Sequence, residues 1–140
     1  MEDRMPVLPT PEAMTELCRG TLPAQFGIVF RSIEPGLVVA TMTVEARFLA
    51  PNGVLHAGTL VTLADTTCGA GTLSALRAGT NFSTIELKTN FLGTVRDGEL
   101  ICTATAQHLG RATQVWDAEV VGKATGKRLA LFRCTQMILG

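Results

Sequence analysis

The chain has 140 residues, of which 46% are hydrophobic and 17% are charged. This composition is typical of one folded domain spanning residues 1–140 rather than of a disordered chain. Twelve basic and twelve acidic side chains cancel, and aromatic residues make up only 5%, which argues against a nucleic-acid-binding surface. No apolar stretch approaches the roughly 18–20 residues that a membrane-spanning helix requires. We therefore expect neither a nucleic acid nor a membrane as a partner.

The predicted elements begin with a short helix over residues 11–19. A threonine N-cap, a proline in the first turn and a following acid are typical of a helix start. Two strands are expected next, over residues 26–32 and 37–44, and in the second of them apolar side chains alternate with threonines. After a short loop, residues 56 to about 76 form the longest helical candidate.

From residue 80 onward the hydrophobic pattern has a period of two, which predicts strands. In the first of these strands Ile85, Leu87 and Phe91 fall on one face. An Arg-Asp-Gly sequence at 96–98 predicts a hairpin turn into the next strand. The remaining strands of this four-stranded meander are expected over residues 99–108, 112–121 and 128–138.

This order of elements predicts the fold class α+β, with an antiparallel sheet of about six strands wrapped around one long central helix and a short N-terminal helix. Residues 1–9 lack the apolar segment of a signal peptide. The four cysteines lie far apart in the sequence without a C-x-x-C pair. We therefore expect buried free thiols in a cytoplasmic protein.

The predicted central helix contains a single carboxylate, Asp65, and no lysine or arginine before Arg77. A surface helix normally carries charges on its solvent face, so we expect this helix to be covered on most sides. Burial raises the pKa of a carboxyl group, and such a group in an apolar setting is a candidate for catalysis. The alternative is structural: Asp65 accepts hydrogen bonds from Thr62, Thr66 or backbone groups and joins two elements.

His56 stands at the start of the same helix, next to Ala57 and Gly58. Backbone N–H groups in the first helical turn have no acceptor within the helix and can donate to a developing oxyanion. The small side chains let a carbonyl group approach these donors. The alternative is that His56 and Asn52 only cap the helix and stabilise the preceding loop.

The spacing of His56 and Asp65 determines how both groups would act in one reaction. They are nine positions apart, which places them about 13 Å apart along a helix axis and half a turn out of phase. Two such groups on one straight helix do not reach the same substrate atom. If both serve one reaction, two chains meet and each contributes one end of its helix, which favours a symmetric dimer with two interfacial sites.

Three other polar residues are weaker candidates. Arg111 follows a glycine at the start of a strand and either binds a phosphate group or is solvated. His108 has no visible partner, and Thr84 opens a strand, where threonine is common, so a structural role is expected for both. No set of residues has the spacing of metal ligands. Neither Ser74 nor Ser83 lies in the G-x-S-x-G motif of an α/β-hydrolase.

The run 52–58 (NGVLHAG), followed by Asp65, resembles the signature of hotdog-fold acyl-CoA thioesterases of the phenylacetate-degradation (PaaI-like) family. That family has Asn, Gly and then His-Gly-Gly, with an acid seven residues after the second glycine of the triplet. The stretch 84–92 is similar to the strand that follows the family's helix, and Gly110-Arg111 is a third match. The resemblance covers residues from about 11 to 138.

The resemblance implies a role for each motif residue. Asp65 would be the nucleophile or the general base that activates water, and the backbone N–H of Ala57 would polarise the thioester carbonyl. Asn52 would orient the water or the leaving group, His56 would shape the oxyanion loop, and Thr84 would assist near the acid. Such chemistry needs carbonyl polarisation and an oxygen nucleophile, with no metal or other cofactor.

The resemblance further implies homo-oligomers, in which dimers commonly pair into tetramers. Arg111 would contact the phosphates of coenzyme A. Apolar residues near the motif indicate an apolar acyl pocket, which fits aryl and medium-chain acyl groups alike. The residues expected at this pocket are Gly58, Leu60, Leu63 and Phe82.

Two departures from the family pattern affect these expectations. Ala57 replaces the first glycine after the histidine; alanine keeps its N–H, but its methyl group narrows the approach or shifts specificity. Residues 93–95 (Gly-Thr-Val) replace the more usual basic-Pro stretch, which in the family forms part of the nucleotide contact.

The first functional hypothesis is hydrolysis of an acyl-CoA thioester to a free carboxylic acid and coenzyme A. The second is an acyl-CoA dehydratase of the same fold, in which a histidine and an acid move protons on a β-hydroxyacyl group. The third is a non-catalytic acyl-CoA-binding module, without an appended DNA-binding segment because the domain is expected to use all 140 residues. Release of a free thiol or formation of an enoyl chromophore distinguishes the first two.

Overall fold

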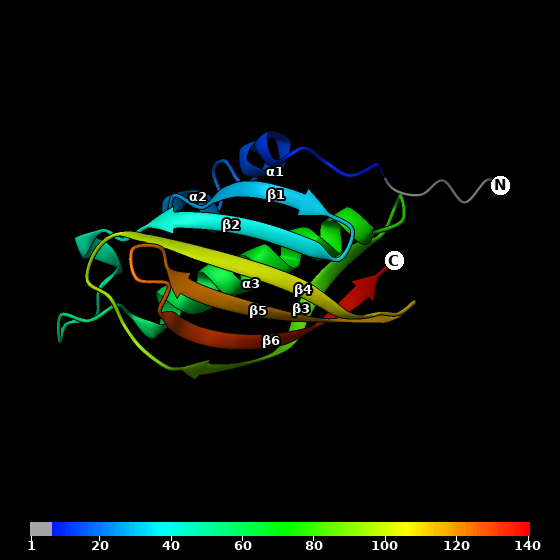
Figure 1. Ribbon diagram of the computed structural model, residues 1–140. Coiled ribbons are helices and arrows are strands. Elements are labelled where there is room, and N and C mark those ends of the chain that lie inside the picture. Colours follow the sequence, from blue (N-terminus) through cyan, green and yellow to red (C-terminus); the bar gives the residue numbers. More distant parts are fainter. Residues whose placement is uncertain (1–6) are drawn as a thin grey trace.

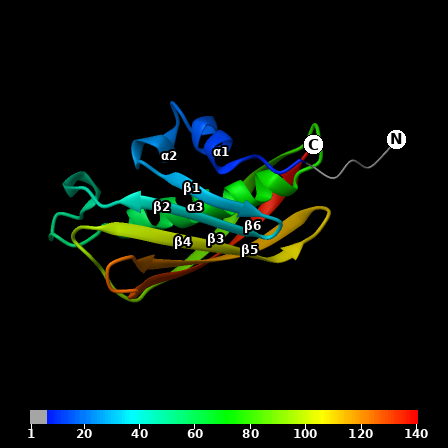
Figure 2. The ribbon, with the colours of Figure 1, turned by 45° about the horizontal axis from the view of Figure 1, so that its top comes forward.

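The computed structural model describes residues 7–140, in which a six-stranded antiparallel sheet curls around one long helix (Figure 1). Two short helices lie beyond the first strand, at one edge of the sheet (Figure 2). The elements are α1 (Pro11–Leu17), α2 (Leu22–Gln25), β1 (Val29–Glu34), β2 (Leu37–Thr43), a 3-10 turn (Ala46–Phe48), α3 (Ala57–Ala75), β3 (Asn81–Phe91), β4 (Glu99–Leu109), β5 (Thr113–Gly122) and β6 (Arg128–Leu139).

The expected architecture is confirmed, but the strands do not form the predicted meander. Their order in the sheet is β1-β2-β4-β5-β6-β3, so β3 pairs with β6 and occupies an edge. The predicted hairpin at 96–98 is therefore wrong, since this segment connects two strands that are not neighbours. The N–H groups of Leu92 and Gly93 both donate to the carbonyl of Leu129 and hold the chain beside β6. An Asp-Gly turn signal marks a reversal of the chain but does not specify the strand that pairs.

The strand predicted from residue 26 begins later, at Val29, because a short helix precedes it. Phe26 is the C-cap of α2, and Pro23 lies in the first turn of that helix. The ring of Phe26 stacks on Phe48, with centroids 4.9 Å apart and planes inclined by 9°. The apolar character of Phe26 thus serves this contact rather than a strand.

Helix α3 is buried on most of its surface, as its lack of charges predicts: 11 of its 19 residues are buried. Three of its buried or half-buried hydroxyls, those of Thr62, Thr67 and Ser74, donate to carbonyl groups one turn earlier; Thr62 donates to Gly58 at 2.8 Å. Small residues let the strands approach closely. A Cβ atom at Gly71 would lie 2.7 Å from Cζ2 of Trp116, so this position requires glycine for the indole to pack on the helix.

A β-bulge at Ile85 shifts the alternation of β3 by one residue. Before the bulge Thr84 pairs with Gln136, and after it Leu87 pairs with Cys134; both partners are buried positions of β6. The prediction that places Ile85 and Leu87 on one face is therefore wrong. Thr84, which precedes the bulge, pairs with the inward Gln136 and faces α3.

The hydrophobic core lies between α3 and the inner face of the sheet, and residues of α1 and β1 extend it at one edge. The four cysteines are free, and three of them are buried, in agreement with the expected thiols. Within residues 7–140, none of the helices has the length and hydropathy needed to cross a bilayer.

Candidate active site

Asp65 lies near the middle of α3, half-buried, and accepts a hydrogen bond from the hydroxyl of Thr84 at 2.9 Å. Burial raises the pKa of the Asp65 carboxyl, and the hydrogen bond from Thr84 opposes this rise. Thr62 donates to a backbone carbonyl rather than to Asp65. In the part of the chain that the structure describes, no cationic side chain pairs with Asp65. The carboxyl group is thus desolvated without a compensating charge.

A cavity of about 270 Å³ lies beside Asp65. Its wall is mainly apolar and joins α1 and the following turn to β1, α3 and β3. Of the described residues that line it, Asp65 is the only one with a formal charge. The cavity can therefore hold an apolar group directly next to a carboxylate. The lining residues are Met14, Leu17, Cys18, Thr21, Pro23, Phe30, Asp65, Thr66, Gly69, Ala70, Leu73 and Phe82.

The start of α3 presents a second set of polar groups. His56 is the N-cap, and its Nδ1 atom accepts the N–H of Gly58 at 2.7 Å. The neutral imidazole therefore carries its proton on Nε2. The N–H of Ala57 has no acceptor among residues 7–140, and Ala57 is exposed. His56 caps the helix while one backbone donor at the N-terminus of a 19-residue helix stays available to a ligand.

These two sets are separated within one chain. Ala57 and Asp65 lie eight positions apart on α3, which is about 12 Å along the axis. Asn52 lies exposed in the loop before the helix, close in sequence to His56. The structure thus brings Asp65, Thr84 and the cavity together and leaves the helix start with Asn52 as a separate group.

The other predicted residues occupy different places. Phe82 lines the cavity, whereas Leu60 and Leu63 are buried in the core and do not line it, and Gly58 lies in the first turn of α3. Arg111 is exposed in the turn between β4 and β5, and over the described residues its side chain has no ion-pair partner.

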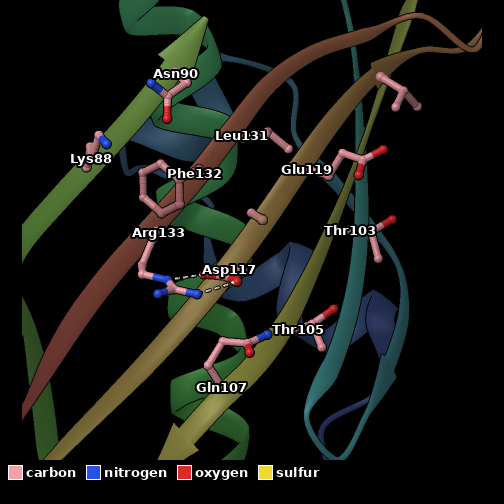
Figure 3. A pocket seen from close by; sticks show the side chains of 12 residues that line it. Lys88, Asn90, Thr103, Thr105, Gln107, Asp117, Glu119, Leu131, Phe132 and Arg133 are labelled. Carbon is pink, nitrogen blue, oxygen red and sulfur yellow. Dashed lines mark hydrogen bonds and ion pairs between the residues drawn. The ribbon is translucent and has the colours of Figure 1, made fainter.

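A larger concavity of about 780 Å³ lies on the outer face of the sheet and is lined by side chains of β3, β4, β5 and β6 (Figure 3). Asp117, one of two carboxylates in this concavity, accepts a hydrogen bond from Nη2 of Arg133 at 2.9 Å. This ion pair raises the pKa of the Arg133 guanidinium group. The concavity contains none of the predicted catalytic residues. The smaller cavity beside Asp65 is therefore the candidate active site.

Two parts of this site have no counterpart among the residues that the sequence predicts. The first is the wall contributed by Met14, Leu17 and Cys18, which no local pattern connects with residue 65. The second is Gln136, which is fully buried and whose Oε1 atom lies 2.7 Å from Oγ1 of Thr84. A signal for Gln136 does exist, because a polar residue there interrupts an alternating apolar strand at an inward position.

Comparison with known proteins identifies the family. The sequence pattern described as the thioesterase superfamily matches residues 52–128. The chain belongs to this family. It is 38% identical over 112 residues to the acyl-coenzyme A thioesterase PaaI of Escherichia coli, covering 76% of this chain and 74% of that protein. It is 32% identical over 109 residues to a 1,4-dihydroxy-2-naphthoyl-CoA hydrolase of Listeria monocytogenes, covering 78% and 88%.

Solved structures agree with this assignment. A mutant thioesterase of Pseudomonas aeruginosa superposes with a TM-score of 0.91 at 28% sequence identity and covers 96% of this chain and 97% of that one. The expected hotdog fold is thereby confirmed, and so is the expected enzyme class, a thioester hydrolase of the acyl-CoA thioesterase type. The family match contains Asp65 and Ala57 but does not reach Gln136.

Proposed function

We propose that the protein hydrolyses an acyl-CoA thioester to a carboxylic acid and coenzyme A, with Asp65 as the nucleophile or the general base. The observation that carries this proposal is an unpaired, half-buried carboxylate in the wall of an apolar cavity. An apolar acyl group in that cavity would lie next to the one charged side chain of the described lining. The names of the relatives, which include acyl-CoA and naphthoyl-CoA hydrolases, support the substrate class.

The reaction needs one oxygen nucleophile and one oxyanion donor. In the general-base form, Asp65 takes a proton from water, the water oxygen bonds to the carbonyl carbon, the carbon–sulfur bond breaks, and the proton passes to the leaving thiolate. In the covalent form, the carboxylate oxygen bonds to the carbonyl carbon, the carbon–sulfur bond breaks with release of the coenzyme A thiolate, and water then hydrolyses the resulting anhydride. Both forms need an ionised Asp65. The raised pKa of this carboxyl makes it a stronger base than an exposed aspartate.

The oxyanion donor of the proposal is the N–H of Ala57, which points from the helix start without an acceptor in the described chain. Because this donor lies about 12 Å along the helix from Asp65 of the same chain, we assign each active site to two chains. Strand β3 is an edge strand with exposed apolar side chains, among them Ile85, Leu87 and Phe91. Such an edge favours pairing with a second copy, and two of these dimers would form the homotetramer.

The remaining motif residues take supporting roles in this proposal. Thr84 positions the carboxyl group by its hydrogen bond. His56 orders the first turn of α3 by capping Gly58, and Asn52 is near enough in sequence to orient the water or the leaving group. Arg111, exposed in its turn, binds the phosphates of coenzyme A.

The proposal also includes the domain organisation and the cellular location of the enzyme. The hydrophobic core that joins α1, α3 and the sheet supports one hotdog domain. Four free cysteines favour the reducing cytoplasm as its location.

The test is the variant Asp65→Asn, assayed for thiol release from acetyl-, octanoyl- and benzoyl-CoA with a disulfide reagent. Removing the base or nucleophile should lower kcat by at least about 10²-fold. The matched control is Asp117→Asn, which removes a carboxylate from the outer concavity and should retain wild-type turnover. Near wild-type turnover by a folded Asp65→Asn protein, or an enoyl product in place of thiol, would contradict the proposal.

A further inference from the structure

Gln136 is a buried amide in an otherwise apolar part of β6. Its side chain has no solvent exposure, and the inward neighbours Phe132 and Cys134 are buried as well. Burying an amide is unfavourable unless its donors and acceptor find partners. The partners of Gln136 therefore indicate why the chain keeps a polar side chain at this position.

Gln136 is linked to Asp65 through one hydroxyl group. The register pairs Gln136 with Thr84 across β6 and β3, so that Thr84 faces α3. Oγ1 of Thr84 lies 2.9 Å from Oδ1 of Asp65 and 2.7 Å from Oε1 of Gln136. Nε2 of Gln136 lies 3.6 Å from the sulfur of Cys134. The amide of Gln136 thus contacts the Thr84 hydroxyl, which in turn contacts the carboxyl group of Asp65.

The number of protons in this chain of contacts limits its states. Thr84 has a single hydroxyl proton, so it cannot donate to an ionised Asp65 and to Oε1 of Gln136 together. With Asp65 ionised, all contacts are satisfied if the amide is rotated: Nε2 of Gln136 then donates to Thr84, and Thr84 donates to Asp65. With Asp65 protonated, Asp65 donates to Thr84 and Thr84 donates to Oε1. Each protonation state of Asp65 therefore corresponds to one orientation of the amide.

We propose that Gln136 is a positioning residue for Asp65, whose amide presents nitrogen to Thr84 when the carboxyl is ionised and oxygen when it is protonated. This inference rests on the proposed function, because it gives the amide a part in the proton transfers of that reaction. The carboxyl group can then gain and lose a proton without losing its hydrogen bond to Thr84. The amide donor also stabilises the ionised form, which is the reactive one.

Within residues 7–140, the titratable groups found beside Asp65 are thiols. Cys18, the C-cap of α1, lines the same cavity, Cys68 lies one turn further along α3, and Cys134 lies on β6 close to Gln136. Burial raises the pKa values of Cys18 and Cys68, so both stay neutral below pH 8. The charged residues Glu86 and Lys88 of β3 pair with outward positions of β6. A titration in the acidic range at this site is therefore that of Asp65.

The most direct test uses the wild-type protein. The side-chain amide signals of Gln136 and the carboxyl carbon signal of Asp65 are followed by NMR from pH 4 to pH 8. Rotation of the amide should make both signals titrate with the same midpoint. A Gln136 amide that does not respond while Asp65 titrates would overturn the inference, and this readout does not depend on whether Asp65 is catalytic.

Variants add a functional readout. Gln136→Met keeps the length of the side chain but removes the amide, so the acidic limb of the kcat/KM profile should move to higher pH, with about a threefold loss at pH 5 relative to pH 8. The matched control is Gln114→Met, which removes a buried glutamine that pairs with Gln136 but bonds Trp116 instead. This control should leave the limb unchanged. An equal displacement in both variants would mean a structural role only and would reject the inference.

A double variant tests the route through Thr84. Thr84→Val removes the hydroxyl that links Gln136 to Asp65, so adding Gln136→Met to this variant should not move the acidic limb of the kcat/KM profile further. If the two substitutions move the limb additively, Gln136 does not act through Thr84. One outcome separates the two proposals: Asp65→Asn abolishes turnover, while the acidic limb of the kcat/KM profile is the same in Gln136→Met as in the wild type. That result would support the proposed function and contradict only this inference.

Discussion

Asp65 and Asp117 are two carboxylates in the walls of two concavities, on opposite faces of the same sheet. Asp117 lies in the larger concavity, beside the guanidinium of Arg133, with its charge compensated. Asp65 lies in the smaller one, half-buried, with a single hydroxyl as side-chain donor. Desolvation and lack of a counter-charge, rather than the size of the concavity, distinguish Asp65, the carboxylate that we propose as catalytic, from Asp117.

The largest effect expected from this comparison comes from the oxyanion donor that we propose for the site at Asp65. Ala57→Pro removes the N–H that we assign to this role. Proline is favourable at the first helical position, and the preceding His56, with φ −64° and ψ 133°, has a conformation allowed before proline. We expect kcat to fall by about 10²-fold, measured as thiol release.

The control for this variant is Ala57→Ser, which keeps the N–H and should keep most of the activity. Both proteins should show the circular dichroism of the wild type. A fully active Ala57→Pro enzyme would show that the helix start does not stabilise the oxyanion, and the site would then need another donor.

The next effect, on kcat/KM for different acyl groups, tests which of the two concavities holds the acyl group. A Cβ atom at Gly69 would lie 3.3 Å from Cζ of Phe82 in the cavity wall. Gly69→Ala should therefore displace the ring and lower kcat/KM for octanoyl- or benzoyl-CoA by about tenfold, with little change for acetyl-CoA. Thr105→Val, on the outer face, should change none of these values. Equal losses for all three substrates would argue that the cavity does not hold the acyl group.

The smallest effect concerns stability and its dependence on pH. Burial raises the pKa of Asp65 in the folded state above its unfolded value, so the folded protein binds more protons between these values and loses stability as the pH rises through them. Asp65→Asn should therefore raise Tm at pH 7 relative to the wild type, and the difference should shrink below about pH 4. Asp117→Asn loses only an exposed ion pair, worth at most about 1 kcal/mol.

Calorimetric scans at several pH values check this expectation. A wild-type protein more stable than Asp65→Asn at pH 7 would mean that the carboxylate is stabilised by its surroundings. The contrast between the two carboxylates would then disappear.

The sequence predicts the parts of this molecule that depend on local composition. A long segment with one carboxylate indicates a buried helix and singles out Asp65, and small residues after His56 indicate an accessible helix start. Alternation locates most strands within a few residues. These features depend on neighbours in the chain and can be recognised without the fold.

The parts that the sequence does not predict depend on pairing between distant segments. The bulge at Ile85 exists only in the context of β6, and so does the pairing of Thr84 with the inward Gln136, by which Thr84 faces Asp65. Met14 and Leu17 reach the cavity across some 50 positions of sequence. The pairing of β3 with β6, in place of the predicted hairpin, is also the feature that brings Gln136 to the site.

The central claim is that Asp65 of one chain acts on a carbonyl group held by Ala57 of another. Its most direct test is the activity of mixed oligomers formed by coexpressing equal amounts of two inactive variants, Ala57→Pro and Asp65→Asn. In half of the resulting dimers one of the two sites receives an intact residue from each chain, so the mixture should recover about a quarter of the wild-type activity. Activity no higher than that of the separate variants would contradict a site shared between chains.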